Sequence, residues 1–153
     1  MRYEIYKTLI RPIATYGAEA WTLTKKDADK LKIFERKVIR RIYGAVKEGD
    51  IWRIRNNKEV NEVLEGENIV KFIKVQRLRW LGHIMRMQKE RTPNAIYTAK
   101  MEGKRRPGRP RSRWADETES DLKAMEIINW KRKAQDRGEW RGIVREAKAH
   151  PAL

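Results

Sequence analysis

The sequence predicts an all-α fold, in which a helical bundle is followed by a basic linker and then by a small helical C-terminal lobe. Apolar residues recur every three or four positions through most of the chain, cap residues and glycines mark helix ends, and no long stretch alternates as a strand does. We therefore expect a helical domain at 1–99, a Pro/Gly-rich linker at 100–113 and a helical lobe at 114–153.

Two helices are expected before Gly44. Residues 3–20 have a helical pattern that Pro12 interrupts, because proline lacks a backbone N–H and crowds the preceding turn. A second helix is expected at 25–43, because Thr24 and Asp27 resemble a capping box and Gly44 stands where a C-terminal glycine should.

The helix at 25–43 has two different faces. Its apolar stripe consists of Leu31, Phe34, Val38 and Ile42. Its opposite side carries the basic residues Lys32, Arg36 and Arg40. We expect the apolar side to pack and the basic side to meet water or phosphate.

The middle of the chain predicts a short helix that begins after Asn57 and stops at Gly66, and a longer one that begins after Asn68 and runs to about Met87. The longer helix is apolar on several sides, which is typical of the central helix of a bundle. Trp80 lies on its strongest apolar stripe, so we expect this side chain in the core. Trp52 is expected in a loop, where it is as well suited to base stacking as to packing.

The linker is the sharpest sequence signal, since seven of the fourteen residues from Lys100 to Arg113 are basic. Prolines, glycine and like charges predict an extended, exposed segment. Gly108-Arg109-Pro110 resembles the core of an AT-hook, although Pro107 stands where that motif has arginine. A nuclear-import signal built from Lys104, Arg105 and Arg106 would explain the same residues, and the two roles are compatible. Beyond the linker we expect a helix from Trp114 to Met125 and a last one, capped by Asn129, that reaches Lys148.

The charge balance points to a polyanionic partner. Lysine and arginine number 37 against 21 acidic residues, which gives a formal charge of +16. Such a surface attracts phosphate backbones by counterion release, so we expect RNA or DNA as partner, with a merely basic protein as the plain alternative. The candidate nucleic-acid-binding residues are Lys104, Arg105, Arg106, Arg109, Arg111, Arg113, Lys32, Arg36, Arg40, Trp52, Arg53 and Arg55.

Several classes of site are not expected. The chain has no cysteine, and His83 and His150 are far apart in sequence, so we expect neither a metal site nor a disulfide. Charged residues interrupt every apolar run, so we expect no membrane span or signal peptide. The expected location is the nucleus or a cytoplasmic ribonucleoprotein.

Seven short motifs occur in an order that resembles the region following the palm in LINE-type (non-LTR) retrotransposon endonuclease–reverse transcriptases. They are Tyr6–Pro12, Tyr16–Trp21, Phe34–Lys37 with Ile42–Gly44, Trp52–Asn56, Arg77–His83, Arg105–Arg111 with Trp114 and Asp116, and Asp136–Arg137 with Trp140–Arg141. The resemblance covers nearly the whole chain. It implies a thumb-like helical module that grips a template–primer duplex beside the palm and fingers.

The resemblance also implies that polymerase chemistry lies elsewhere. In the family, metal-binding aspartates of the palm, including an adjacent pair, carry the reaction, and this sequence has no Asp-Asp pair. We therefore expect no enzyme activity, no cofactor and no small-molecule substrate. The alternatives are a helical protein-interaction module that packs against a separate palm, and a domesticated, transposon-derived orphan protein. An independent nuclease would need a carboxylate cluster that the sequence does not show.

Overall fold

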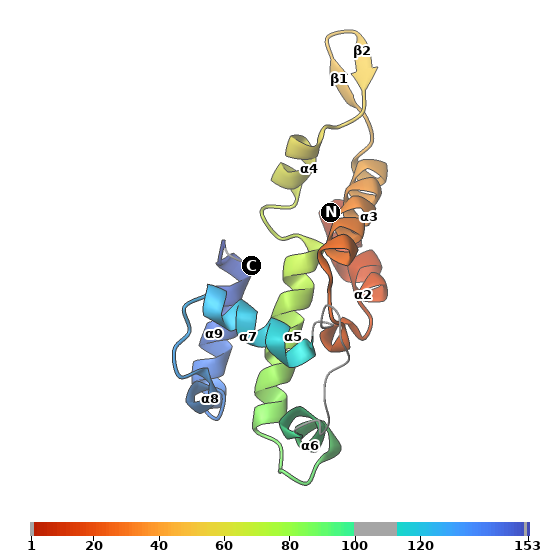
Figure 1. Cartoon of the computed structure of the whole chain (residues 1–153). Helices are drawn as coiled ribbons and strands as arrows, with labels where there is room; N and C mark the ends of the chain where they lie inside the picture. The colour runs from red at the N-terminus through yellow and green to blue at the C-terminus, as the bar shows by residue number, and fades with distance from the viewer. Residues whose placement is uncertain (1, 100–112, 152) are drawn as a thin grey trace. The chain divides into compact units, whose positions relative to one another are not determined.

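The computed structural model describes residues 2–99, 113–151 and 153, which are mostly helical and form two compact units (Figure 1). The first unit combines Met1–Ala18 with Leu23–Ile73, and the second combines Glu19–Thr22 with Lys74–Leu153. The predicted all-α class holds for most of the described chain, with one small β-hairpin as an addition.

The N-terminal helical segment changes its hydrogen-bonding pattern at Pro12. It consists of α1 (Arg2–Ile5), the π-helical turn η1 (Tyr6–Ile10) and α2 (Arg11–Ala14), and the 3-10 turn η2 (Ala18–Ala20) follows. The N–H of Arg11 donates to the carbonyl of Tyr6, five residues back. This wider turn comes directly before Pro12, which then lies in the first turn of α2, where its missing N–H costs little.

Helix α3 (Lys25–Tyr43) has the predicted bounds and the predicted caps. The Thr24 hydroxyl accepts from the N–H of Asp27 at 3.2 Å, and the Asp27 carboxylate accepts from the N–H of Thr24 at 3.3 Å. The predicted apolar stripe is partly wrong, because Phe34 is 39% exposed whereas Ile39 and the charged Glu35 are buried. The packed face is therefore rotated away from Phe34.

A β-hairpin follows α3, contrary to the expectation of an all-helical chain. Strand β1 (Val46–Glu48) pairs antiparallel with β2 (Ile51–Arg53), and Figure 1 shows the hairpin extending beyond α3. Strands of three residues are too short to show alternation in the sequence. Gly49 occupies the first position of the two-residue turn with a φ of 62°, which a type II′ hairpin turn requires.

Two further helices complete the first unit and begin the second. Helix α4 (Asn57–Val63) is capped by Asn56, whose side chain accepts from the N–H of Glu59 at 2.9 Å. Helix α5 (Ile69–Met85) follows Asn68, whose side chain accepts from the N–H of Lys71, also at 2.9 Å. Helix α5 agrees closely with the predicted range, whereas α4 begins one residue earlier than predicted and ends at Val63, before Gly66.

The second unit adds α6 (Thr92–Thr98), α7 (Trp114–Ala124), α8 (Trp130–Lys133) and α9 (Arg137–Ala149). The single last helix expected after Asn129 is thus two helices. Asn129 stands at the N-cap position of α8, as predicted, but it has a left-handed φ of 53° and its side chain makes no capping hydrogen bond. Asp136 caps α9 instead, accepting from the N–H of Glu139 at 2.7 Å.

Each unit has its own apolar core. The buried residues of the first unit form two clusters, which are Tyr6, Ile39, Val60 and Leu64, and Ala18, Ile69, Val70 and Ile73. The buried cluster of the second unit is Val75, Leu78, Leu81, Leu122, Met125, Ala134, Trp140, Ile143, Val144 and Ala147. Trp80, expected in the core, is only half-buried and stands outside these clusters, whereas Trp140 is 3% exposed.

The boundary between the units falls inside α5, after Ile73, and not at the basic segment. Residues of α5 after Ile73 share one buried cluster with residues of α7 and α9. No helix in the described part of the chain is long and apolar enough to cross a bilayer.

Candidate nucleic-acid interface

The structure describes only some of the basic residues that were predicted to bind nucleic acid. Lys104, Arg105, Arg106, Arg109 and Arg111 lie outside the described residues. Arg113 is described, and it is exposed immediately before α7. It therefore remains available to a ligand, while the role of the other five stays a prediction.

The predicted basic face of α3 is partly used to hold the fold together. Arg40 donates to the Arg55 carbonyl at 2.8 Å and to the Asn57 side chain at 2.6 Å. Lys32 is exposed and Arg36 half-buried, and Arg36 donates to the carbonyl of Lys32 at 3.2 Å. Lys32 and Arg36 thus remain candidates for phosphate binding, whereas Arg40 is committed to joining α3 to α4.

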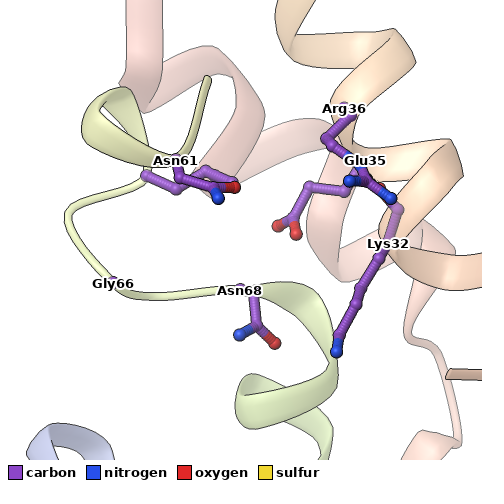
Figure 2. A pocket seen from close by; sticks show the side chains of 7 residues that line it. Lys32, Glu35, Arg36, Asn61, Gly66 and Asn68 are labelled. Carbon is purple, nitrogen blue, oxygen red and sulfur yellow. The ribbon is translucent and has the colours of Figure 1, made fainter. Parts of the chain in front are cut away.

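Lys32 and Arg36 border a hollow of about 400 Å³ between α3, α4 and the start of α5 (Figure 2). Figure 2 shows them with Glu35 on α3, facing Asn61 and Asn68. Glu35 is 1% exposed and accepts from the Tyr6 hydroxyl at 2.6 Å and from the N–H of Ile69 at 3.0 Å. These contacts tie Glu35 into the core, and burial raises its pKa despite the hydrogen bonds.

Arg53, Arg55 and Trp52 lie at or beside the hairpin. Arg53 forms ion pairs with Glu48 and with Glu59, the latter through two hydrogen bonds of 3.0 and 2.8 Å. Arg55 is half-buried over the ring of Tyr43, at 5.7 Å from its centroid. Arg53 is therefore compensated, and Trp52, which is 67% exposed, is the free member of this group.

A strongly basic groove lies in the second unit, and we call it the cationic groove. It has a volume of about 410 Å³ and is lined by Arg79, Arg86, Arg137, Trp140, Arg141, Val144, Arg145 and Lys148. Six of these eight residues are cationic and none is acidic. In α9 the cations are spaced by four, four and three residues, which places them on one face.

Long-range hydrogen bonds fix the walls of the cationic groove. The indole N–H of Trp140 donates to the Leu78 carbonyl at 2.9 Å, which ties α9 to α5. Arg86 donates to the carbonyl of Ala134 at 2.8 Å, and the Gln135 side chain donates to the carbonyl of Met85 at 3.0 Å. The cations therefore stand on a preformed support.

The cations of the cationic groove have no ion-pair partners in the described part of the chain. None of its six cations forms an ion pair with a described carboxylate, and like charges four residues apart on a helix repel each other. Partial burial, and then the nearby Arg137 and Arg141, hold the pKa of Arg86 below its usual range. An anionic ligand that displaces counterions would relieve this repulsion.

The lining residues of the cationic groove are not among the predicted binding residues, although Arg79, Arg137, Trp140 and Arg141 lie within motifs of the family resemblance. The available signal was the basic spacing in the last helix, and the pairing of this helix with Arg79 and Arg86 is not visible in the sequence. Among the described residues, no group of three or more His, Asp or Glu side chains is placed to hold a metal ion.

The chain is distantly homologous to a transposon-derived protein. Over 151 residues, or 95% of this chain, it is 25% identical to the uncharacterized transposon-derived protein F52C9.6 of Caenorhabditis elegans. The chain spans 54% of that protein's length, or about half. No protein-family model matches the chain, and no solved structure matches it.

Proposed function

We propose that this chain is a non-catalytic nucleic-acid-binding module of transposable-element origin, which holds RNA or DNA by its phosphates. The observation that carries the proposal is the cationic groove, with six cations, no acid and an apolar floor of Trp140 and Val144. Guanidinium groups bind phosphate oxygens by charge-assisted hydrogen bonds without reading sequence. We propose the same phosphate binding for the arginines at 105, 106, 109, 111 and 113.

The groove has suitable dimensions for a phosphate backbone. From Arg137 to Lys148 the helix rises by roughly 17 Å at 1.5 Å per residue. One strand of duplex DNA presents a phosphate about every 3.4 Å along the axis, so a strand lying along α9 offers several phosphates to these side chains. Affinity from such contacts is strongly salt-dependent and depends little on sequence.

A finer part of the proposal concerns origin. The order of motifs resembles the region after the palm of LINE-type reverse transcriptases, and the transposon-derived relative supports a mobile-element source. We propose that the chain corresponds to the thumb and following region, which grips template–primer while a separate palm carries the chemistry. The absence of an Asp-Asp pair in the sequence supports a non-catalytic role.

A second candidate function, a protein-interaction module, rests on an apolar stripe of the N-terminal helical segment. Its residues are spaced by four, four and three positions, and they are Ile5, Leu9, Ile13 and Tyr16, with exposed fractions of 45%, 60%, 80% and 88%. Monomers seldom leave a run of large apolar side chains in water. This stripe is compatible with a polymerase palm as a protein partner, and it does not compete with the cationic groove for residues.

The experiment is a binding comparison of the full chain with duplex DNA, single strands and an RNA–DNA hybrid at several salt concentrations. The proposal expects binding to all three ligands that weakens steeply with salt. Failure to bind any of them at low salt would contradict it and would leave the protein-interaction module as the better account. Primer extension above background, in a preparation free of other polymerases, would contradict the non-catalytic part.

A further inference from the structure

We infer that the β1–β2 hairpin is a second contact site, which binds unpaired nucleobases by stacking on Trp52. This inference rests on the proposed function, and it names the form of nucleic acid that the chain prefers. It predicts that unpaired bases add affinity that a fully paired duplex cannot supply.

The register of the hairpin determines which side chains share a face. Lys47 pairs with Trp52, whereas Val46 pairs with Arg53 and Glu48 with Ile51. Side chains alternate across a strand, so Trp52 and Lys47 share one face and the Arg53 side lies on the other. The face with Trp52 and Lys47 therefore combines a flat aromatic surface with an exposed ammonium group, which lies 3.9 Å from the carboxylate of the exposed turn residue Asp50.

The opposite face anchors the hairpin to α4. Arg53 joins Glu48 of β1 to Glu59 of α4, and Glu59 also accepts from the N–H of Asn56 at 2.8 Å. The pKa of Glu59 is lowered to about 2, mainly by the Arg53 guanidinium and also by the hydrogen bond from the N–H of Asn56. These contacts hold Trp52 on a defined strand, so less side-chain and backbone entropy is lost when a ligand binds.

Trp52 is unusual among the tryptophans of the chain. Of the six, only Trp21 and Trp52 are exposed, at 36% and 67%, and the other four are buried or half-buried. Ile51 and Ile54 beside Trp52 are also more than 70% exposed. A two-stranded hairpin has no core of its own to cover these side chains, so they are open to a ligand.

Charge indicates which ligand fits. Residues 36–58 contain eight lysines and arginines against two acidic residues, and 8 − 2 gives a net charge of +6 around the hairpin. A ligand that is anionic and also presents flat apolar faces matches this surface. Unpaired bases on a phosphate backbone have both properties, whereas in a duplex the base faces are stacked on each other.

The test compares a labelled single strand with a blunt duplex that contains the same strand, in DNA and RNA versions, for the full chain and three variants. The variants are Trp52→Ala, Trp52→Phe and the matched control Trp21→Ala. Trp52→Ala should weaken single-strand binding by about five-fold or more, because loss of one stacked base has that size, while duplex binding stays unchanged. Trp52→Phe should retain part of the affinity, and Trp21→Ala should match the wild type.

Thermal unfolding of each variant shows whether the fold is kept, which we expect because both tryptophans are exposed. An unchanged single-strand affinity in Trp52→Ala, or an equal loss on single strand and duplex, would overturn the hairpin inference and leave the proposed function intact. Absence of wild-type binding to either ligand at low salt would overturn both. DNA and RNA ligands that respond alike would support stacking on the bases, without a contribution from the sugar hydroxyl.

Discussion

Gly82 leaves the space that the indole of Trp140 occupies. A Cβ atom at position 82 would lie 2.1 Å from Trp140 Nε1 and 2.2 Å from Trp140 Cδ1. Trp140 is 3% exposed and donates to the carbonyl of Leu78, one turn before Gly82. This contact explains why a helix otherwise rich in large side chains contains a glycine.

Gly82→Ala should therefore destabilise the protein by about 1–3 kcal/mol, because the added methyl must displace a buried indole. Chemical denaturation measures this difference in the free energy of unfolding. Gly142→Ala is the matched control, since Gly142 lies in α9 with open space where the new methyl group would stand. The control should be neutral or stabilising by up to about 1 kcal/mol. Equal effects of the two substitutions would argue against the close contact.

Arg77 should be essential for stability in the second unit. It is 2% exposed and forms ion pairs with Glu117 and, at 2.8 Å, with Asp121. Arg77→Ala leaves these carboxylates without their buried guanidinium, so we expect a loss of about 3–5 kcal/mol. Arg79→Ala, an exposed site on the same helix, should change the unfolding free energy by less than about 0.5 kcal/mol. A loss at Arg77 no larger than at Arg79 would show that the ion pairs do not stabilise the fold.

Glu35 should make stability depend on pH. Burial raises its pKa above the ordinary value of 4.5, so the folded state binds the proton more tightly than the unfolded state. Stability from this group is present below pH 4.5 and is lost as pH rises through the folded pKa. Glu35→Gln removes this titration. The unfolding free energy of the variant minus that of the wild type should therefore increase as pH rises through that window. Glu62→Gln, at an exposed site in α4, should show no such trend, and a flat difference for Glu35→Gln would contradict the account.

Local signals predicted much of the helical fold. The cap residues Thr24 and Asn68 predicted the starts of α3 and α5, because an N-cap acts within one turn. The left-handed conformation of Asn129 and the β-hairpin were not predicted. A single left-handed residue and strands of three residues leave only weak patterns in the sequence.

The features that the sequence did not predict depend on contacts between residues far apart in the chain. Periodicity alone favoured Trp80 as a core residue, but the packing of α9 against α5 buries Trp140 and leaves Trp80 half-buried. Glu35 is buried because Tyr6 and the N–H of Ile69, both distant in sequence, supply its hydrogen bonds. The cationic groove likewise requires α5 and α9 together, so a motif search along one helix could not define it.

The most direct test of the proposed function is the salt dependence of duplex DNA binding in a groove variant and a charge-matched control. The groove variant changes four cations of α9 to glutamine, at Arg137, Arg141, Arg145 and Lys148. The control makes the same change at four exposed lysines of α3 that line neither hollow, Lys25, Lys26, Lys30 and Lys37.

Each lost phosphate contact makes the slope of log affinity against log salt shallower by about 0.9, so the groove variant should lose roughly 3–4 units if all four residues bind phosphate. The control should keep nearly the wild-type slope, because its lysines lie outside the groove. The control should unfold at the wild-type temperature, since its substituted side chains are exposed, and the groove variant should unfold at that temperature or slightly above it, because it also loses the repulsion between like charges on α9. A groove variant with wild-type affinity and slope would contradict the claim that the cationic groove binds nucleic acid.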